Sequence, residues 1–172
     1  INMPLLAQAA DVSPVRITDG STYTMTADSV INTGSNTTGI FVGYKDGGTI
    51  VGDNVTVTSD GYGIQIQTYA TGGVAGSGDC SIELGKTIVE AKSSAVRVDS
   101  SSYGQKATVI LGAGSILNSS ANSAVYVTGK DSLLQIGDGS TVTGNSYGAT
   151  GAALASSSGG KIEIGNGVTI GH

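Results

Sequence analysis

The sequence is poor in the residues that build disulfides, metal sites and nucleic-acid contacts. Its 172 residues include one cysteine, two prolines, one histidine and eight basic residues, against thirteen acidic ones. Cys80 cannot form an internal disulfide, and a lone thiol has no metal-ligand or redox spacing. The formal net charge of -5, with its cations scattered along the chain, argues against nucleic acid as a partner.

Several familiar functional motifs are also missing. There is no run of eighteen apolar residues, so no membrane-spanning helix is expected. His172 is the only histidine, which excludes a Ser-His-Asp triad and a histidine-based zinc site. The segment Gly76–Asp79 has the letters of a calcium-binding glycine-aspartate repeat, but it occurs once and lacks the nonapeptide period. The sequence therefore predicts no metal and no cofactor.

Glycine and β-branched residues dominate instead. The chain has 28 glycines and no triplet period, which excludes a collagen-like structure. Valine, isoleucine and threonine favour strands because their branched side chains restrict χ1. An all-β chain is expected.

One pattern recurs along the chain: a strand ended by glycine, a polar turn, a short strand, a second turn, and a strand opened by a small residue. The first strands end at Gly52, Gly85, Gly112, Gly137 and Gly165, which lie 33, 27, 25 and 28 residues apart. The second strands have apolar anchors at Val55, Ile88, Ile116, Val142 and Val168. The third strands have theirs at Ile40, Ile64, Val96, Val125 and Ala153. Three short strands cannot bury an apolar face alone, so the repeats must stack.

The predicted fold is a right-handed parallel β-helix of about five to six coils, each with three short strands. Stacking at roughly 4.8 Å places like side chains in interior columns. In the first strands, alternation points Ile82, Leu84 and their equivalents inward and Glu83, Ile110, Gln135 and Glu163 outward. A slip of one residue would bury both glutamates, so the register is well specified. The alternative, an antiparallel sandwich or barrel, does not explain the fixed strand order.

The predicted solenoid spans residues 15–172. Residues 1–14 are either the remnant of a secretory signal, with Ala7-Gln8-Ala9 as a small-x-small pattern, or an N-terminal cap that uses Met3, Leu5 and Leu6. The longest insertion, residues 68–79, is expected to protrude as a mobile glycine-rich loop. Because the last coil stops before a third strand, we expect the chain to be a fragment of a longer solenoid.

Two segments, Ser132–Gly144 and Gly160–Ile170, resemble passenger domains of bacterial autotransporters of the pertactin-like class. The resemblance is one of repeat style and covers most of the chain. It implies secretion or display at the bacterial outer membrane, a signal peptide upstream, a β-barrel downstream, and a role in adhesion or cell aggregation.

Catalysis is not expected from the outward carboxylates. Glu83 and Glu163 are three coils apart, about 14 Å at the stacking distance, which exceeds the separations used in glycoside hydrolysis. Arg97 and Asp99 alternate with buried valines and are expected to form a surface ion pair.

The outer side of the third strands is the best candidate binding surface, since aromatic and arginine side chains offer rigid contact area with polar ends. Its predicted members are Phe41, Gln65, Arg97, Tyr126 and Leu154. The outer side of the second strands is expected to present β-branched and apolar residues that could pair two copies, namely Thr56, Val89, Leu117, Thr141 and Thr169.

The sequence therefore predicts a non-catalytic β-helix that acts in adhesion to a surface protein or glycan, or in self-association. Two alternatives stay open: a glycan-degrading enzyme whose active site lies on other coils, and a purely structural stalk.

Overall fold

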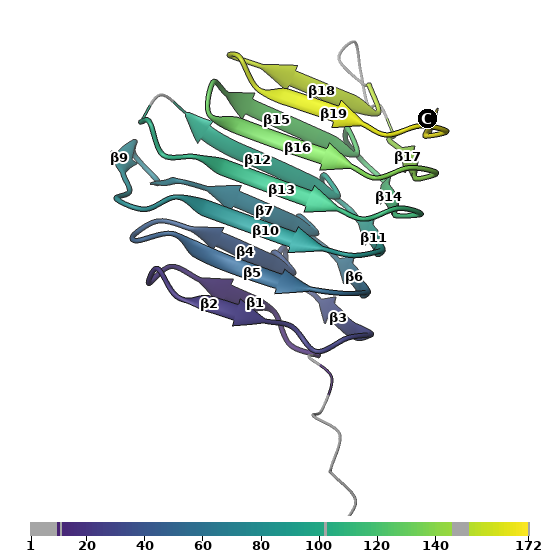
Figure 1. Cartoon of the computed structure of the whole chain (residues 1–172), viewed down its shortest axis with the longest axis horizontal. Coiled ribbons are helices and arrows are strands. Elements are labelled where there is room, and N and C mark those ends of the chain that lie inside the picture. Colours follow the sequence, from purple (N-terminus) through teal and green to yellow (C-terminus); the bar gives the residue numbers. More distant parts are fainter. Residues whose placement is uncertain (1–9, 11, 102, 146–151, 172) are drawn as a thin grey trace, which may run out of the picture.

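The protein is an all-β solenoid, a parallel β-helix, in the computed structural model. The structure describes residues 10, 12–101, 103–145 and 152–171. Successive coils stack in chain order, from the first coil at the purple end to the last at the yellow end of Figure 1. The part of the chain that is described contains no helix, and so none that could cross a bilayer.

Each coil contributes one strand to each of three six-stranded parallel sheets. Sheet A contains β1 (Val15–Ile17), β4 (Ile40–Gly43), β7 (Ile64–Gln67), β12 (Val96–Ser101), β15 (Val125–Gly129) and β18 (Leu154–Ser157). Sheet B contains β2 (Thr22–Thr24), β5 (Gly48–Gly52), β10 (Cys80–Leu84), β13 (Ala107–Leu111), β16 (Ser132–Ile136) and β19 (Lys161–Ile164). Sheet C contains β3 (Ser29–Thr33), β6 (Val55–Ser59), β11 (Thr87–Ala91), β14 (Ile116–Ser119), β17 (Thr141–Thr143) and β20 (Thr169–Gly171).

Sheet B has the predicted orientation. Ile82, Val109 and Leu134 pair in one column and are fully buried, while Glu83 and Glu163 lie on the outside. One predicted alignment is wrong: Gly52 pairs with Leu84 and not with Gly85. The step is therefore 32 residues (84 minus 52). A Cβ on Gly52 would press on Met25 and Leu84, so these two side chains fill the core place that Gly52 leaves.

In two strands of sheet C, the residues that face the core are shifted by one position relative to the prediction. Val89 and Leu117, expected outside, are fully buried, and Ile88 and Ile116 face outward. The outward column therefore reads Val30, Thr56, Ile88, Ile116, Thr141 and Thr169.

Small hydroxyl residues occupy the core places at the start of these strands. Thr87, Ser115 and Ser140 are fully buried, and two of their amides donate to a hydroxyl in the next coil. Thr87 N donates to Ser115 Oγ at 3.0 Å, and Ser115 N donates to Ser140 Oγ at 3.1 Å. Their own hydroxyls donate to carbonyls within the turn, as Ser115 Oγ does to Gly112 O at 2.7 Å. Buried hydroxyls that are hydrogen-bonded in this way carry little desolvation cost. Because these residues point inward, the alternation along each strand also places Val89 and Leu117 inside.

The insertion at residues 68–79 protrudes as predicted, but it forms a short hairpin rather than an irregular loop. It contains an antiparallel hairpin of β8 (Tyr69–Ala70) and β9 (Val74–Ala75), which projects at one side of the stack (Figure 1). Two glycines with positive φ, Gly72 and Gly73, make its turn, where residues with a Cβ would be strained. The hairpin lies between β7 of sheet A and β10 of sheet B.

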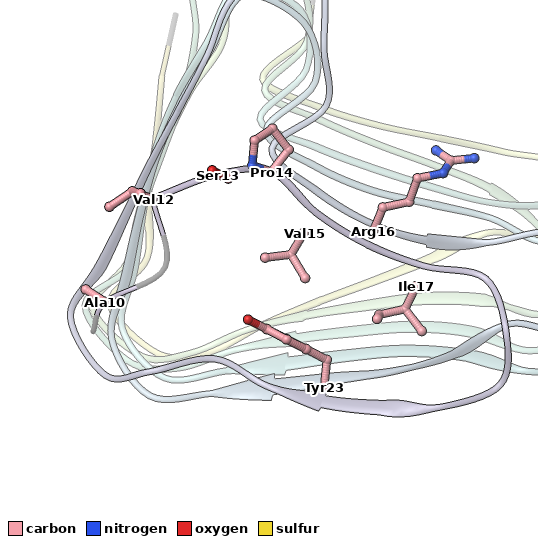
Figure 2. Close-up of a pocket in the computed structure, with 8 residues that line it drawn as sticks. All are labelled: Ala10, Val12, Ser13, Pro14, Val15, Arg16, Ile17 and Tyr23. Carbon is pink, nitrogen blue, oxygen red and sulfur yellow. The ribbon is translucent and has the colours of Figure 1, made fainter. Parts of the chain in front are cut away.

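A hollow of about 360 Å³ opens at the N-terminal end of the solenoid. Figure 2 shows Val15, Ile17 and Tyr23 on the inner side of the first coil, with Arg16 on the opposite side of the strand. These inner side chains continue the interior columns, so the hollow is the end of the core. The signal remnant or cap is predicted over residues 1–14. Of these, residues 1–9 and 11, which include Met3, Leu5 and Leu6, lie outside the described residues.

Candidate binding face on sheet A

The outer face of sheet A carries a column of side chains that come from successive coils. Its register runs Arg16, Phe41, Gln65, Arg97, Tyr126 and Ala155. Four of the five predicted residues, Phe41, Gln65, Arg97 and Tyr126, thus lie side by side as expected.

Leu154 does not belong to this column, which corrects the prediction. Leu154 pairs with Val125 in an inward column and packs against the core, and Ala155 takes the outward place next to Tyr126. The buried residue that opens this strand is Ala153, equivalent to Ala124. The sequence Ala152-Ala153 allowed both frames, and the frame observed places the larger leucine in the hydrophobic interior.

Both arginines of the column contact aromatic rings. The guanidinium of Arg16 lies 4.2 Å from the centroid of the Phe41 ring. The guanidinium of Arg97 lies 5.0 Å from the Tyr126 ring and 5.6 Å from the Tyr62 ring. At these distances a cation is attracted to the π face of the ring, which fixes the orientation of a long side chain.

The predicted ion pair between Arg97 and Asp99 is present, with 3.5 Å between Nη2 and Oδ2. It is less exposed than expected, since the side chain of Asp99 is only 6% exposed. The hairpin explains the difference: the hydroxyl of Tyr69 in β8 donates a short hydrogen bond to Asp99 Oδ2. Burial, together with this bond to the carboxylate, raises the pKa of Tyr69 to about 12. The Tyr69 ring also contacts that of Tyr103, with centroids 5.6 Å apart.

Two hollows flank Arg97 and Tyr126 on this face. The first, of about 350 Å³, lies against the hairpin and is lined by Tyr69, Arg97, Asp99, Tyr126, Thr128, Lys130 and Ser158. The second, of about 300 Å³, is lined by Tyr62, Ser94, Arg97, Asn122, Ser123, Tyr126 and Ala155. Arg97 and Tyr126 line both hollows, and together they form the ridge between them.

Sequence reasoning missed three residues of this face: Tyr62, Tyr69 and Lys130. Each lies outside the alternating part of a strand, so its direction cannot be obtained from period-two alternation. Tyr62 directly precedes the small residue Gly63 that opens β7, and the equivalent places in other coils hold the small residues Thr38, Ser94, Ser123 and Ala152. An aromatic residue at that repeat position was a usable signal. Tyr69 and Lys130 depend on the path of the hairpin and of a turn.

No protein-family model, no curated protein and no solved structure matches this chain.

Carboxylates elsewhere on the surface do not gather into a site. The register places Ile110 and Gln135 between Glu83 and Glu163, and Gln135 Nε2 donates to Glu163 Oε2 at 2.7 Å. Within residues 10, 12–101, 103–145 and 152–171, no three His, Cys, Asp or Glu side chains lie close enough together to hold a metal ion. Cys80 is buried, and desolvation raises the pKa of its thiol to about 12.

Proposed function

We propose that this chain is a non-catalytic binding module of an exported or surface-displayed protein, and that the outer face of sheet A binds carbohydrate in adhesion. The observation that carries the proposal is the position of Arg97, whose guanidinium is held between the rings of Tyr62 and Tyr126 with a hollow on each side.

The chemistry of this face fits sugar rings. The apolar faces of sugars pack on aromatic rings, and their hydroxyls pair with guanidinium and amide groups. Besides Arg97, the face carries the amide of Gln65, whose Oε1 accepts a 2.8 Å hydrogen bond from Thr38. The supporting backbone is a continuous parallel sheet, so little conformational entropy is lost when a ligand binds.

The proposal is tested by applying the full chain to a glycan array and then measuring affinities for the sugars retained. We expect Tyr126→Ala and Arg97→Ala to weaken binding by tenfold or more. Gln135→Ala, an outward residue of sheet B, is the matched control and should bind as the wild type does. Equal binding by all four proteins, or no binding at all, would refute a role for this face.

The same samples distinguish binding from catalysis. A binding module leaves its glycan intact, so incubation should generate no new reducing ends and no unsaturated products. Product release that Arg97→Ala abolishes would instead support the glycan-degrading alternative.

Export is proposed on other grounds. The repeat style of Ser132–Gly144 resembles that of autotransporter passengers, and Ala7-Gln8-Ala9 reads as a small-x-small site. We expect antibodies against the chain to label intact cells of the source bacterium, and we expect its full gene to encode an outer-membrane barrel. Labelling only after lysis would contradict display at the surface.

Self-association is a second candidate, favoured by the outer face of sheet C. Val30 is 46% exposed there, and Ile88 and Ile116 extend the same column. Asp28 and Lys86 line a hollow of about 330 Å³ beside Val30, so two copies related by a twofold axis could exchange opposite charges. Sedimentation of the wild type and of Ile88→Lys over a range of concentrations tests this candidate. A monomer at every concentration excludes it.

A further inference from the structure

The hollow between the β8–β9 hairpin and sheet A has the chemistry to recognise a charged sugar. We infer that it is a subsite for a sugar residue that carries an anionic group, a carboxylate or a sulfate. This inference rests on the proposed binding of carbohydrate and adds the class of sugar and the residue that selects it.

The charge of the hollow has the opposite sign to that of the chain. Its lining contains the two cations Arg97 and Lys130 and the single carboxylate Asp99, in a chain of formal net charge -5. Asp99 is already engaged, since Tyr69 donates to its Oδ2 and Arg97 lies 3.5 Å from the same atom. Asp99 lines the hollow, but its negative charge is offset by the guanidinium of Arg97, so Lys130 leaves the lining with a net positive charge.

Lys130 is the cation left for a ligand. The ion pairs among the described residues are Lys92 with Asp60 and Arg97 with Asp99, and Lys130 takes part in neither. Lys130 lies at the exposed turn between β15 and β16, at the edge of the hollow. An ammonium group in that place attracts an anion as a point charge and does not require one orientation of its oxygens.

Two residues that line the hollow, Tyr126 and Thr128, have hydroxyl groups oriented by hydrogen bonds to the neighbouring Ser157. The hydroxyls of Tyr126 and Ser157 lie 3.0 Å apart, and Ser157 Oγ donates to Thr128 Oγ1 at 2.9 Å. Since Thr128 Oγ1 accepts this bond, its own hydrogen can point toward a ligand. Thr128 and Lys130 line the same hollow, so one sugar can offer a ring hydroxyl to Thr128 and its anionic group to Lys130.

The volume of the hollow and its aromatic lining fit one sugar ring. Its volume of about 350 Å³ is at the small end of the range for small-molecule sites. Tyr126 of sheet A and Tyr69 of the hairpin both line it and supply aromatic surface. The hairpin, which occurs in one coil, contributes Tyr69 to this hollow and to no other hollow described on the face.

The test compares matched oligosaccharides by isothermal titration with the full chain. The probes are trigalacturonate, its neutral methyl ester, and a sulfated neutral trisaccharide with its unsulfated parent. We expect an anionic probe to bind at least tenfold more tightly than its neutral partner and to weaken as salt is added. Comparison of trigalacturonate with the sulfated trisaccharide identifies whether a carboxylate or a sulfate is preferred.

Lys130→Ala should reduce the affinity for the preferred anionic probe to that for its neutral partner, and Lys130→Arg should retain most of it. Lys161→Ala, which removes an exposed cation on sheet B, is the control for a general effect of charge and should change nothing. Circular dichroism verifies that each variant folds.

The outcomes separate this inference from the proposed function. Equal affinity for charged and neutral probes, or a preference that survives Lys130→Ala, overturns the anionic subsite while sugar binding stands. Absence of binding to all four probes also overturns the subsite, and a silent glycan array in addition removes the proposed function.

Discussion

Single residues inside this solenoid are constrained in size because each touches the coils before and after it. The positions that open the strands of sheet A show this most clearly. Gly63 precedes β7, and a Cβ built on it would lie 2.3 Å from Val89 Cγ1 and 2.7 Å from the carbonyl oxygen of Ala95. Both neighbours are fully buried, and Gly63 O accepts a hydrogen bond from Ile40 N at 2.9 Å. The strand therefore has little room to move.

We predict that Gly63→Ala lowers the free energy of unfolding by about 1–3 kcal/mol, the usual cost of overpacking a tight core. Gly34→Ala is the control because no heavy atom lies within 4 Å of its added Cβ. It should change stability by less than about 0.5 kcal/mol. Urea denaturation of both variants measures the difference, and equal midpoints would show that the strand relaxes freely.

Cys80 illustrates the chemical effect of burial at one residue. Only the thiolate reacts with alkylating reagents, and the pKa of about 12 keeps the native thiol protonated at pH 8. We predict that iodoacetamide modifies Cys80 at least about a hundredfold more slowly in the native chain than in urea. Comparable rates in the two states would mean that β10 opens readily.

The same thiol contributes to stability in a defined pH range. Its pKa is higher in the folded state than in the unfolded state, so folding favours the protonated form. This contribution is complete below about pH 8.5, the ordinary thiol value, and is lost as the pH rises toward 12.

At the scale of elements, the β8–β9 hairpin is held to the solenoid by a small number of side chains. Tyr69 donates to the nearly buried carboxylate of Asp99 and contacts Tyr103 through its ring. We predict that Tyr69→Phe lowers the free energy of unfolding by about 1–3 kcal/mol, as expected for a hydrogen bond to a charged group. Tyr103→Phe preserves the ring contact and is the matched control, with a change below about 0.5 kcal/mol.

The pH dependence provides a second readout for this hairpin. The pKa of Tyr69 is about 12 in the folded chain, against about 10 when unfolded, so the protonated phenol favours folding. The stabilisation is complete below pH 10 and declines as the pH rises toward 12. Wild type and Tyr69→Phe should therefore converge in stability over this range. A constant difference between pH 8 and pH 12 would contradict the assignment.

The sequence predicted elements well where alternation was unambiguous. In sheet B, charged residues such as Glu83 separate the apolar ones, so only one frame avoids burying a carboxylate. In sheet C, Ile88-Val89 and Ile116-Leu117 are adjacent apolar pairs, so either member could face the core. The hydrogen-bonded serines and threonines of the core decided the frame there, and small polar residues give no hydrophobic signal.

The candidate site likewise contains residues that the sequence could place and residues that it could not. Phe41, Gln65, Arg97 and Tyr126 could be aligned because they occupy one place in a repeating strand, whereas Leu154 was misplaced by one residue after two alanines. The pocket itself could not be predicted. It depends on the hairpin of residues 69–75, which occurs once and therefore has no equivalent in the repeat to guide its placement.

At the scale of the whole molecule, the solenoid is held together by contacts between neighbouring coils. The strand pairs link each coil only to the one before and the one after it, and no strand pair joins coils further apart in the described chain. Stability in such an architecture is a sum of coil and interface contributions rather than the property of one central core. A local defect should therefore have a local effect, in contrast to the cooperative response of a globular domain.

Leu134→Ala tests this expectation in the fifth coil. Leu134 is fully buried and pairs with Val109 on one side and Ile162 on the other. We predict a loss of about 2–5 kcal/mol, with amide protection reduced in β13, β16 and β19. Protection in β2 and β5 should be unchanged, because one coil lies between β5 and β13 and two lie between β2 and β13. Hydrogen exchange followed by mass spectrometry measures each strand separately. An equal loss of protection in all coils would mean that the stack unfolds as one unit, and that coupling between coils exceeds the stability of each interface.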